Sequence, residues 1–170
     1  MRLFIALPLS DEIRHTLLDV QQQMRGQGVR ANFSRPENLH LTLAFIGETE
    51  GTDVRAAQEA VLSLTGKPFP LTLNRVGNYG RLYWVGLRQS RSLDELAAHV
   101  RLALDARGLD YDRKPFRPHI TVARQVSSPP PLPITLPHLS TTVEQVVLFC
   151  SERVEGRLTY TPIAERRLNG

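Results

Sequence analysis

Two short segments of the sequence place a threonine two positions after a histidine. They read His40-Leu41-Thr42 and His119-Ile120-Thr121, and the two histidines are 79 residues apart. Histidine titrates near neutral pH, so a neutral ring can accept a proton while a second, protonated ring donates one. A threonine hydroxyl can hydrogen-bond a phosphate oxygen. Two such pairs around one phosphate would suit in-line attack at phosphorus, with the attacking and leaving oxygens on opposite sides.

Each segment predicts a β-strand with one polar and one apolar face. Residues i and i+2 of a strand share a face, so His40, Thr42 and Ala44 are expected together, with the leucines between them facing the core. Residues 119–123 repeat this pattern and end at Ala123. Each strand would therefore present an imidazole and a hydroxyl beside a small alanine that leaves room for a ligand.

The two segments also have similar surroundings. An Arg-Pro pair stands upstream of each, Arg35-Pro36 and Arg117-Pro118, and a predicted helix precedes each. This internal similarity, at a spacing close to half of the chain, indicates two related lobes that each give one strand to a central cleft.

Hydrophobic periodicity predicts the elements that position these strands. Strands are expected at residues 2–7, 39–46, 71–76, 82–87, 119–123, 143–149 and 158–163, and helices at 10–26, 52–64 and 92–106. Residues 77–80 and 151–157 are expected as turns, and the proline-rich residues 127–139 as a loop. This order favours an α+β fold of two pseudo-symmetric lobes, each a mostly antiparallel sheet with helices on the outside, around a central cleft. The length fits a single domain spanning residues 1–170.

The chain is basic, with a formal net charge of +4, and its basic residues are almost all arginines. Because a guanidinium group suits phosphate oxygens, this charge is compatible with an anionic substrate such as RNA, although a composition bias would explain it equally well.

Cys150 is the only cysteine, which excludes a disulfide within the chain and predicts a buried thiol. Neither a signal peptide nor a membrane-spanning segment is found, so we expect a cytoplasmic protein.

Two histidines could also bind a metal ion. A metal site normally needs a third or fourth ligand such as Asp, Glu or Cys, and no acidic residue lies on the predicted face of either strand. We therefore expect an acid–base pair that requires neither a metal nor another cofactor.

The duplicated His-apolar-Thr-apolar pattern resembles the 2H phosphoesterase superfamily. Residues 38–48 and 116–124 are similar to the two motifs of its RNA 2′,3′-cyclic phosphodiesterase family, whose members are also described as 2′-5′ RNA ligases of the LigT type, and residues 2–7 also fit. The resemblance covers nearly the whole chain. It implies hydrolysis of RNA 2′,3′-cyclic phosphate ends to 2′-phosphomonoesters.

The resemblance also assigns roles to the residues of both motifs. It implies that His40 is the proton donor to the departing 3′ oxygen and that His119 is the proton acceptor that activates water. Thr42 and Thr121 would hold the phosphate. The residues themselves leave open which histidine donates the proton, so that division comes from the family alone.

Two further residues are implied to bind substrate. Arg124 would contact the phosphate or the terminal base, and Phe45 would stack on that base. Strict alternation places both side chains opposite their histidines, so they reach the cleft only if the strands end or bulge there. The chain also departs from the family upstream of the first motif, where Phe33 stands in a segment that often contains tryptophan.

Two alternative functions stay open at this stage. One is 2′-5′ ligation of tRNA halves, the reverse reaction in the same site, and the other is a non-catalytic module that binds RNA ends through arginines and aromatic residues. The expected partner is RNA with a 2′,3′-cyclic phosphate terminus, including tRNA fragments, and a monomer is expected. Tyr79, Tyr83 and Trp84 belong either to the core or to a substrate wall.

Overall fold

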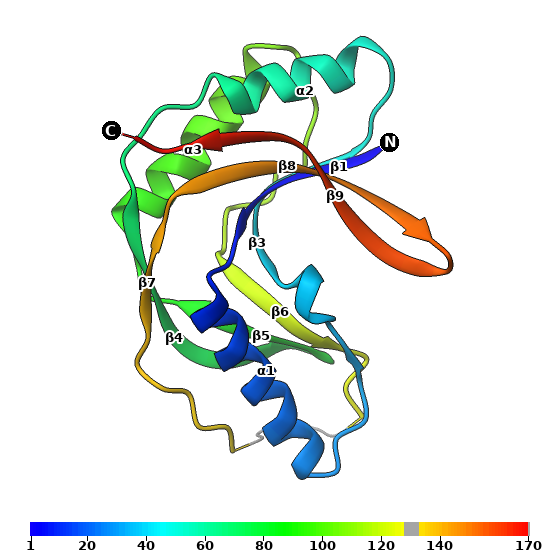
Figure 1. Cartoon of the computed structure of the whole chain (residues 1–170), viewed down its shortest axis with the longest axis vertical. Coiled ribbons are helices and arrows are strands. Elements are labelled where there is room, and N and C mark those ends of the chain that lie inside the picture. Colours follow the sequence, from blue (N-terminus) through cyan, green and yellow to red (C-terminus); the bar gives the residue numbers. More distant parts are fainter. Residues whose placement is uncertain (128–132, 170) are drawn as a thin grey trace.

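Two antiparallel sheets and three α-helices make up the computed structural model, which describes residues 1–127 and 133–169 (Figure 1). The strands are β1 (Arg2–Pro8), β2 (Asn32–Phe33), β3 (His40–Glu48), β4 (Phe69–Tyr79), β5 (Leu82–Leu87), β6 (His119–Arg124), β7 (Ser140–Val143), β8 (Gln145–Val154) and β9 (Arg157–Arg167). The helices are α1 (Asp11–Gly26), α2 (Thr52–Leu62) and α3 (Arg91–Asp105), with a 3-10 turn, η1 (Pro36–Asn38).

The sheets have the strand orders β3-β1-β8-β9 and β2-β6-β5-β4-β7. Every pairing between the described strands is antiparallel. The predicted α+β class with two antiparallel sheets is confirmed. The lobes are not the two halves of the chain, however, because the C-terminal strands β8 and β9 return to pair with β1, and β2 joins the sheet of β6.

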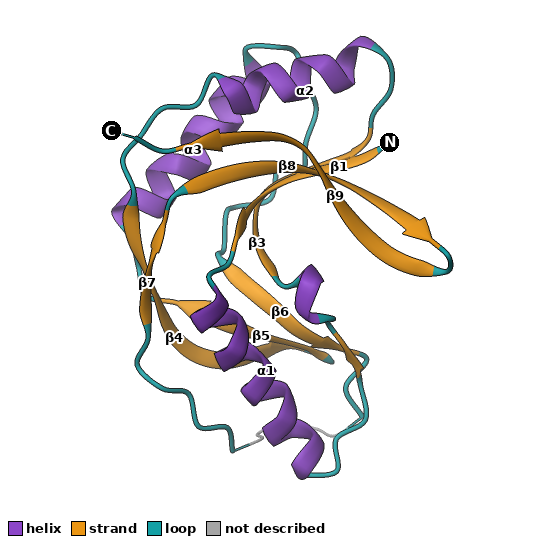
Figure 2. Cartoon of the chain, viewed as in Figure 1, coloured by secondary structure: helices purple, strands orange, loops and turns teal. Residues whose placement is uncertain are grey.

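The helices cover the sheets as their apolar stripes predict (Figure 2). Helix α1 begins after Ser10, whose hydroxyl accepts a hydrogen bond from the backbone N–H of Ile13, and its buried residues follow at helical spacing. It contacts β6, whereas α2 packs on β8 and β9, and α3 packs on α2 and β3. None of the helices in the described residues is long and apolar enough to cross a membrane.

Both predicted turns are shorter in the structure than the sequence indicated. Strand β4 continues to Tyr79, so the first turn consists of Gly80 and Arg81 instead of residues 77–80. Strand β8 continues to Val154, and the second turn consists of Glu155 and Gly156. Both of these residues have positive φ, 51° and 78°, as in the two-residue turns that match the twist of antiparallel strands.

The remaining differences concern short strands and the proline-rich segment. β2 and β7 are too short to give a periodic signal. The sequence predicts no strand at β2, and only the last residue of β7, Val143, lies in a predicted strand. Residues 133–139 have no regular structure, as expected, while residues 128–132 of the predicted loop lie outside the described residues. Cys150 is buried, as predicted.

Gly77 gives the β4–β5 pair a testable packing constraint. It pairs with Trp84, and a Cβ atom at position 77 would lie 2.2, 2.4 and 2.7 Å from three atoms of the indole ring. We expect Gly77→Ala to lower the free energy of unfolding by about 1–3 kcal/mol, measured by urea denaturation, because the buried ring must shift. Gly26→Ala is the control, since a Cβ there meets nothing within 4 Å. Equal stability of Gly77→Ala and the wild type would contradict this account.

Candidate active site

The two predicted His-Thr pairs lie in one cleft between the sheets. β3, which carries His40 and Thr42, is an edge strand of its sheet, and β6, which carries His119 and Thr121, lies between β2 and β5. The cleft has a volume of about 400 Å³. Its walls are formed by Asn32, Phe33, Ser34, Arg35, Asn38, His40, Thr42, His119, Thr121, Arg124, Arg153, Arg157, Leu158 and Tyr160. The structure therefore brings together five of the six predicted site residues in this cleft.

The alternation of faces along β3 is interrupted at Leu43. Thr42 pairs with Ala6 and Ala44 pairs with Ile5 of β1, so one residue of β3 is extra at this point, as in a β-bulge. Ala44 is consequently buried in the hydrophobic core. The prediction that Ala44 shares the face of the histidine is wrong, because that prediction assumed unbroken alternation.

The bulge in β3 also turns Phe45 toward the histidine side. Phe45 is exposed and, together with Thr42, lines two hollows that adjoin the cleft. The guanidinium of Arg2 lies over its ring at 5.3 Å from the centroid. Phe45 does not line the cleft itself, so the structure places this predicted residue at the edge of the site.

Strand β6 is interrupted at the equivalent position, Val122, again three residues after its histidine. Thr121 and Ala123 pair with consecutive residues of β5, so Val122 is the extra residue. Ala123 is fully buried, and its predicted place beside the histidine is wrong for the same reason as in β3. Arg124 returns to the face of His119 and lines the cleft, which an unbroken strand would not allow.

A buried glutamine on α1 holds the bulge in β6. The Gln21 side-chain nitrogen donates to the carbonyl oxygens of Val122, at 3.0 Å, and of Ser34, at 2.8 Å. The Ser34 backbone N–H donates to the same Val122 oxygen at 3.0 Å, and its hydroxyl donates to the Thr121 carbonyl at 3.1 Å. Gln21 is absent from the predicted site residues. The sequence feature that could have revealed Gln21 is its position four residues after Leu17, which places a polar side chain on the apolar stripe of the helix.

Both imidazole rings are anchored in the same way. His40 Nδ1 lies 2.6 Å from the carbonyl oxygen of Asn38, and His119 Nδ1 lies 2.7 Å from that of Arg117. A carbonyl oxygen only accepts, so Nδ1 carries the hydrogen in both rings and Nε2 is the atom that gains or loses a proton. His40 Nε2 lies 2.9 Å from the hydroxyl oxygen of Thr42.

The two histidines differ in their surroundings. The ring of His40 packs against Phe4, with centroids 4.9 Å apart, and against Tyr160 at 5.2 Å, whereas His119 meets the edge of the exposed Tyr79 at 5.8 Å. Burial is the main cause that lowers the pKa of His40 below its ordinary value. The hydrogen bond to Asn38 opposes this shift, and the positive charges of Arg124 and His119 add to it. His40 is therefore mostly neutral at pH 7 when no anion lies in the cleft.

Positive charge dominates the cleft, because four arginines and no acidic residue line it. Arg35 is partly neutralised by Glu37 at 3.2 Å and also donates to the carbonyl oxygen of Leu158. The other three, Arg124, Arg153 and Arg157, form no ion pair with any residue in the described part of the chain. A cleft of this kind favours an anion.

The β8–β9 hairpin supplies the part of the cleft that the sequence did not reveal. Arg153, Arg157, Leu158 and Tyr160 come from this hairpin. Residues 151–157 were interpreted as a turn because they are polar and charged, which hid the strand character of Arg153. The only signal for this wall is the alternation of Leu158 and Tyr160 in the last predicted strand.

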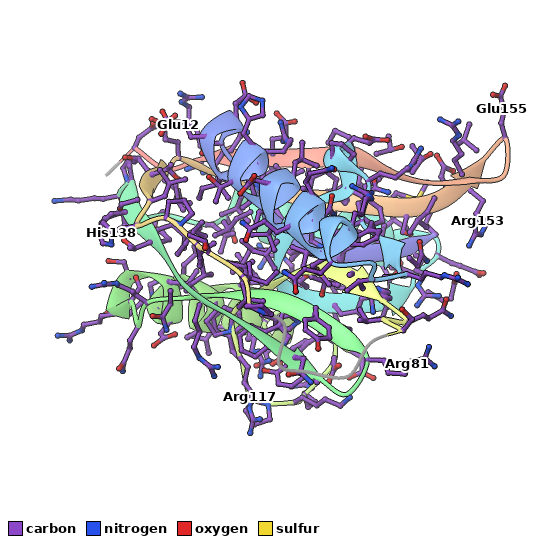
Figure 3. The ribbon with its side chains drawn as sticks, turned by 90° about the horizontal axis from the view of Figure 1, so that it is seen from below. Glu12, Arg81, Arg117, His138, Arg153 and Glu155 are labelled. Carbon is purple, nitrogen blue, oxygen red and sulfur yellow. The ribbon has the colours of Figure 1, made fainter. Side chains whose placement is uncertain are left out.

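The Arg-Pro pairs do not occupy equivalent positions. Arg35 lines the cleft, whereas Arg117 is exposed, projects from the surface in Figure 3 and lines the hollow on the other side of His119. What the two motifs do have in common is a backbone carbonyl, two residues before each histidine, that anchors the ring.

The three aromatic residues Tyr79, Tyr83 and Trp84 divide between the two predicted places. Tyr83 and Trp84 are buried in the core, and Tyr79 forms a wall beside His119.

The cleft has two imidazoles but no carboxylate or thiol among its lining residues that would complete a metal site. Among residues 1–127 and 133–169, no group of three or more His, Cys, Asp or Glu side chains is placed to hold a metal ion. Imidazoles, hydroxyls and guanidiniums meet in the cleft, and they suit a phosphate ester more than a cation.

Comparison with known proteins agrees with this geometry. The sequence pattern of the 2′-5′ RNA ligase superfamily matches residues 11–155. The chain belongs to this superfamily. A similar member is the RNA 2′,3′-cyclic phosphodiesterase of Escherichia coli K12, which is 33% identical over 168 residues, covering 95% of this chain and 93% of the relative. Another is the RNA 2′,3′-cyclic phosphodiesterase of Archaeoglobus fulgidus, 34% identical over 130 residues, covering 73% of this chain and 72% of the relative.

Solved structures of superfamily members share the whole fold. The crystal structure of E. coli LigT complexed with 3′-AMP matches with a TM-score of 0.82 at 31% identity, covering 99% of this chain and 98% of LigT. The structure of TT0787 from Thermus thermophilus matches with a TM-score of 0.85 at 28% identity, covering 100% and 99% of the two chains. The arrangement of the two sheets and three helices is therefore that of the superfamily.

The proximity of the Arg124 charge leads to a testable prediction about the pKa of His40. Because this charge lowers the pKa of His40, Arg124→Gln should raise that pKa, while burial keeps it below the value of a free histidine. NMR titration of the His40 ring protons, assigned with His40→Ala, measures the shift. The exposed Arg88→Gln, outside the cleft, is the control and should leave the pKa unchanged. An unchanged or lowered pKa in Arg124→Gln would contradict the proximity of the two side chains.

Proposed function

We propose that this chain hydrolyses RNA ends that carry a 2′,3′-cyclic phosphate and leaves a 2′-phosphomonoester. The observation that carries the proposal is the pair of identically anchored imidazoles, each with a threonine on its strand, in a cleft lined by arginines and no acid. Relatives named RNA 2′,3′-cyclic phosphodiesterase support the substrate class. The complex of E. coli LigT with 3′-AMP supports the binding of a nucleotide phosphate in this fold.

Two proton transfers complete the proposed reaction. Nε2 of neutral His119 accepts a proton from water as the water oxygen bonds to phosphorus. The bond between phosphorus and the 3′ oxygen breaks on the opposite side, and protonated His40 gives its Nε2 proton to that oxygen. The products are a 3′-hydroxyl and a 2′-phosphate, and solvent restores the two rings to their starting protonation states. Each proton transfer contributes roughly 10²–10⁴ in rate.

The substrate itself would prepare His40 for the acid role. The pKa of His40 is lowered in the free cleft, but the negative charge of a bound phosphate raises it. On protonation, Nε2 changes from acceptor to donor toward Thr42, 2.9 Å away. The Thr42 hydroxyl is then free to donate to a phosphate oxygen. Binding of the phosphate and protonation of His40 therefore favour one another.

The remaining predicted residues would hold the substrate. The hydroxyls of Thr42 and Thr121 and the guanidinium of Arg124 would bind the non-bridging oxygens, which compensates their charge with neither a metal nor another cofactor. Phe45 would stack on the terminal base from the hollow beside Thr42. One chain supplies all of these groups, which supports residues 1–170 acting as a single domain and as a monomer.

The proposal predicts specific losses of activity. With an oligonucleotide ending in a 2′,3′-cyclic phosphate and a chelator present, the wild type should turn over, and His40→Ala and His119→Ala should each lose roughly 10²–10⁴ in kcat. The phosphate should be found at the 2′ position of the product, identified by NMR or by resistance to a 3′-phosphatase. The control is His99→Ala, which removes an exposed histidine of α3 outside the cleft and should retain the wild-type rate. Wild-type turnover by His40→Ala would overturn the proposal.

Ligation is a second candidate, favoured by the open hollow on the His119 side. This hollow is bordered by Phe45, Tyr79, Phe116 and Lys114, so a second nucleoside with a free 5′-hydroxyl could enter where water attacks. Joined product from tRNA halves would support 2′-5′ ligation, and its absence under conditions of active hydrolysis would exclude it.

The third possibility, a non-catalytic RNA-end binding module, requires that no turnover occurs at any pH.

A further inference from the structure

The β8–β9 hairpin projects beyond β1 and β3 (Figure 1), and four of its residues line the cleft. In its register Tyr160 pairs with Ser151, and Leu158 pairs with Arg153. Residues directly opposite each other in antiparallel strands share a face, so Tyr160, Leu158 and Arg153 lie on the same face, and all three line the cleft. Arg157, at the start of β9, also reaches the cleft.

Both hairpin arginines lie farther along the hairpin than Tyr160, the residue that contacts His40. The ring of Tyr160 contacts His40, and the Leu158–Arg153 row is two residues farther along the strand, about 7 Å away. The charges that lower the pKa of His40 belong to Arg124 and His119, both on β6 and not on the hairpin. The hairpin arginines are therefore placed for a second anionic group, farther along the cleft than the one beside His40 and Arg124.

These two guanidiniums keep most of their donors available. Arg153 Nη1 donates to the carbonyl oxygen of Gly156 at 3.2 Å, which steadies the side chain and uses one of its five N–H groups. In Figure 3, Arg153 and Glu155 project from opposite sides of the hairpin. The acid of the turn thus does not neutralise the arginine.

From this placement we infer that Arg153 and Arg157 bind the phosphate on the 5′ oxygen of the terminal nucleotide, the first phosphate upstream of the cyclic end. The inference rests on the proposed function and adds a second phosphate subsite to it. The planar guanidinium fork suits a phosphate monoester or diester. The apolar side chain of Leu158 lies directly across from Arg153, in the row next to Tyr160. The hairpin then makes the enzyme select a nucleotide that continues in the 5′ direction over one that ends in a 5′-hydroxyl.

The test compares two compounds that differ only in this phosphate, cytidine 2′,3′-cyclic phosphate and its 5′-phosphorylated form. For the wild type at low salt, we expect the 5′-phosphate to raise kcat/KM at least about tenfold. Arg153→Gln/Arg157→Gln should abolish most of this advantage and lower kcat/KM for the 5′-hydroxyl compound by a much smaller factor, because that compound loses only the general positive charge of the cleft. The salt dependence of kcat/KM for the 5′-phosphorylated compound should also become shallower, because the variant no longer forms an ionic contact with the 5′-phosphate.

The matched control is Arg55→Gln/Arg88→Gln, which removes the same charge from exposed positions outside the cleft and should keep the advantage of the 5′-phosphate. Three results would overturn the inference: no effect of the 5′-phosphate in the wild type, an unchanged advantage in the hairpin variant, or an equal loss on both compounds, which would place the arginines at the cyclic phosphate. Failure of the wild type to hydrolyse either compound is a different outcome. It would contradict the proposed function and, with it, the subsite.

Discussion

The geometry of the candidate active-site cleft depends on two interruptions of strand alternation, at Leu43 in β3 and at Val122 in β6. An unbroken strand shows every second residue on one face, so a histidine and the residue five positions later would lie on opposite faces. The extra residue in each strand sends the following alanine into the core and returns the next side chain to the histidine side. Phe45 and Arg124 reach the site because of it, and the core gains a continuous apolar surface behind the histidines.

The bulge in β6 is supported from outside the strand. Gln21 and Ser34 together satisfy the carbonyl oxygens of Val122 and Thr121, so α1 and the segment after β2 fix the position of Arg124. An unpaired carbonyl in this buried position would carry a desolvation penalty of about 1–3 kcal/mol. A polar side chain on the apolar face of α1 therefore contributes to the geometry of a cleft that it does not line.

Electrostatics connects this geometry with the chemistry. Anchoring of both rings through Nδ1 leaves Nε2 available for proton transfer, and burial together with Arg124 lowers the pKa of His40. Arg124, Arg153 and Arg157 have no acidic partner among the described residues, so a bound phosphate would relieve their mutual repulsion. In the proposed reaction, substrate binding and the activation of the proton donor would thus be one electrostatic event.

The sequence predicted the features that have a local cause. The two His-Thr strands, the capped and amphipathic helices, and the antiparallel α+β class follow from residue type and periodicity. The bulges at Leu43 and Val122 arise from pairing with β1 and β5, so local sequence does not reveal them. The sequence shows only that the strands must end or bulge there if Phe45 and Arg124 are to reach the cleft. The cleft wall from Arg153 to Tyr160 was missed, since a charged strand near a hairpin tip has the composition of a turn and gains its strand character from its partner. Gln21 acts through contacts with residues about a hundred positions away, which no local pattern records.

The central claim is that His40 protonates the departing 3′ oxygen while His119 activates water. The most direct measurement replaces that oxygen with sulfur, because a thiolate leaves without protonation. On a 2′,3′-cyclic substrate with 3′-bridging sulfur, His40→Ala should recover most of the kcat/KM that it loses on the oxygen substrate, and His119→Ala should recover none. Equal deficits of His40→Ala on both substrates, or recovery by His119→Ala instead, would contradict this assignment of the two histidines.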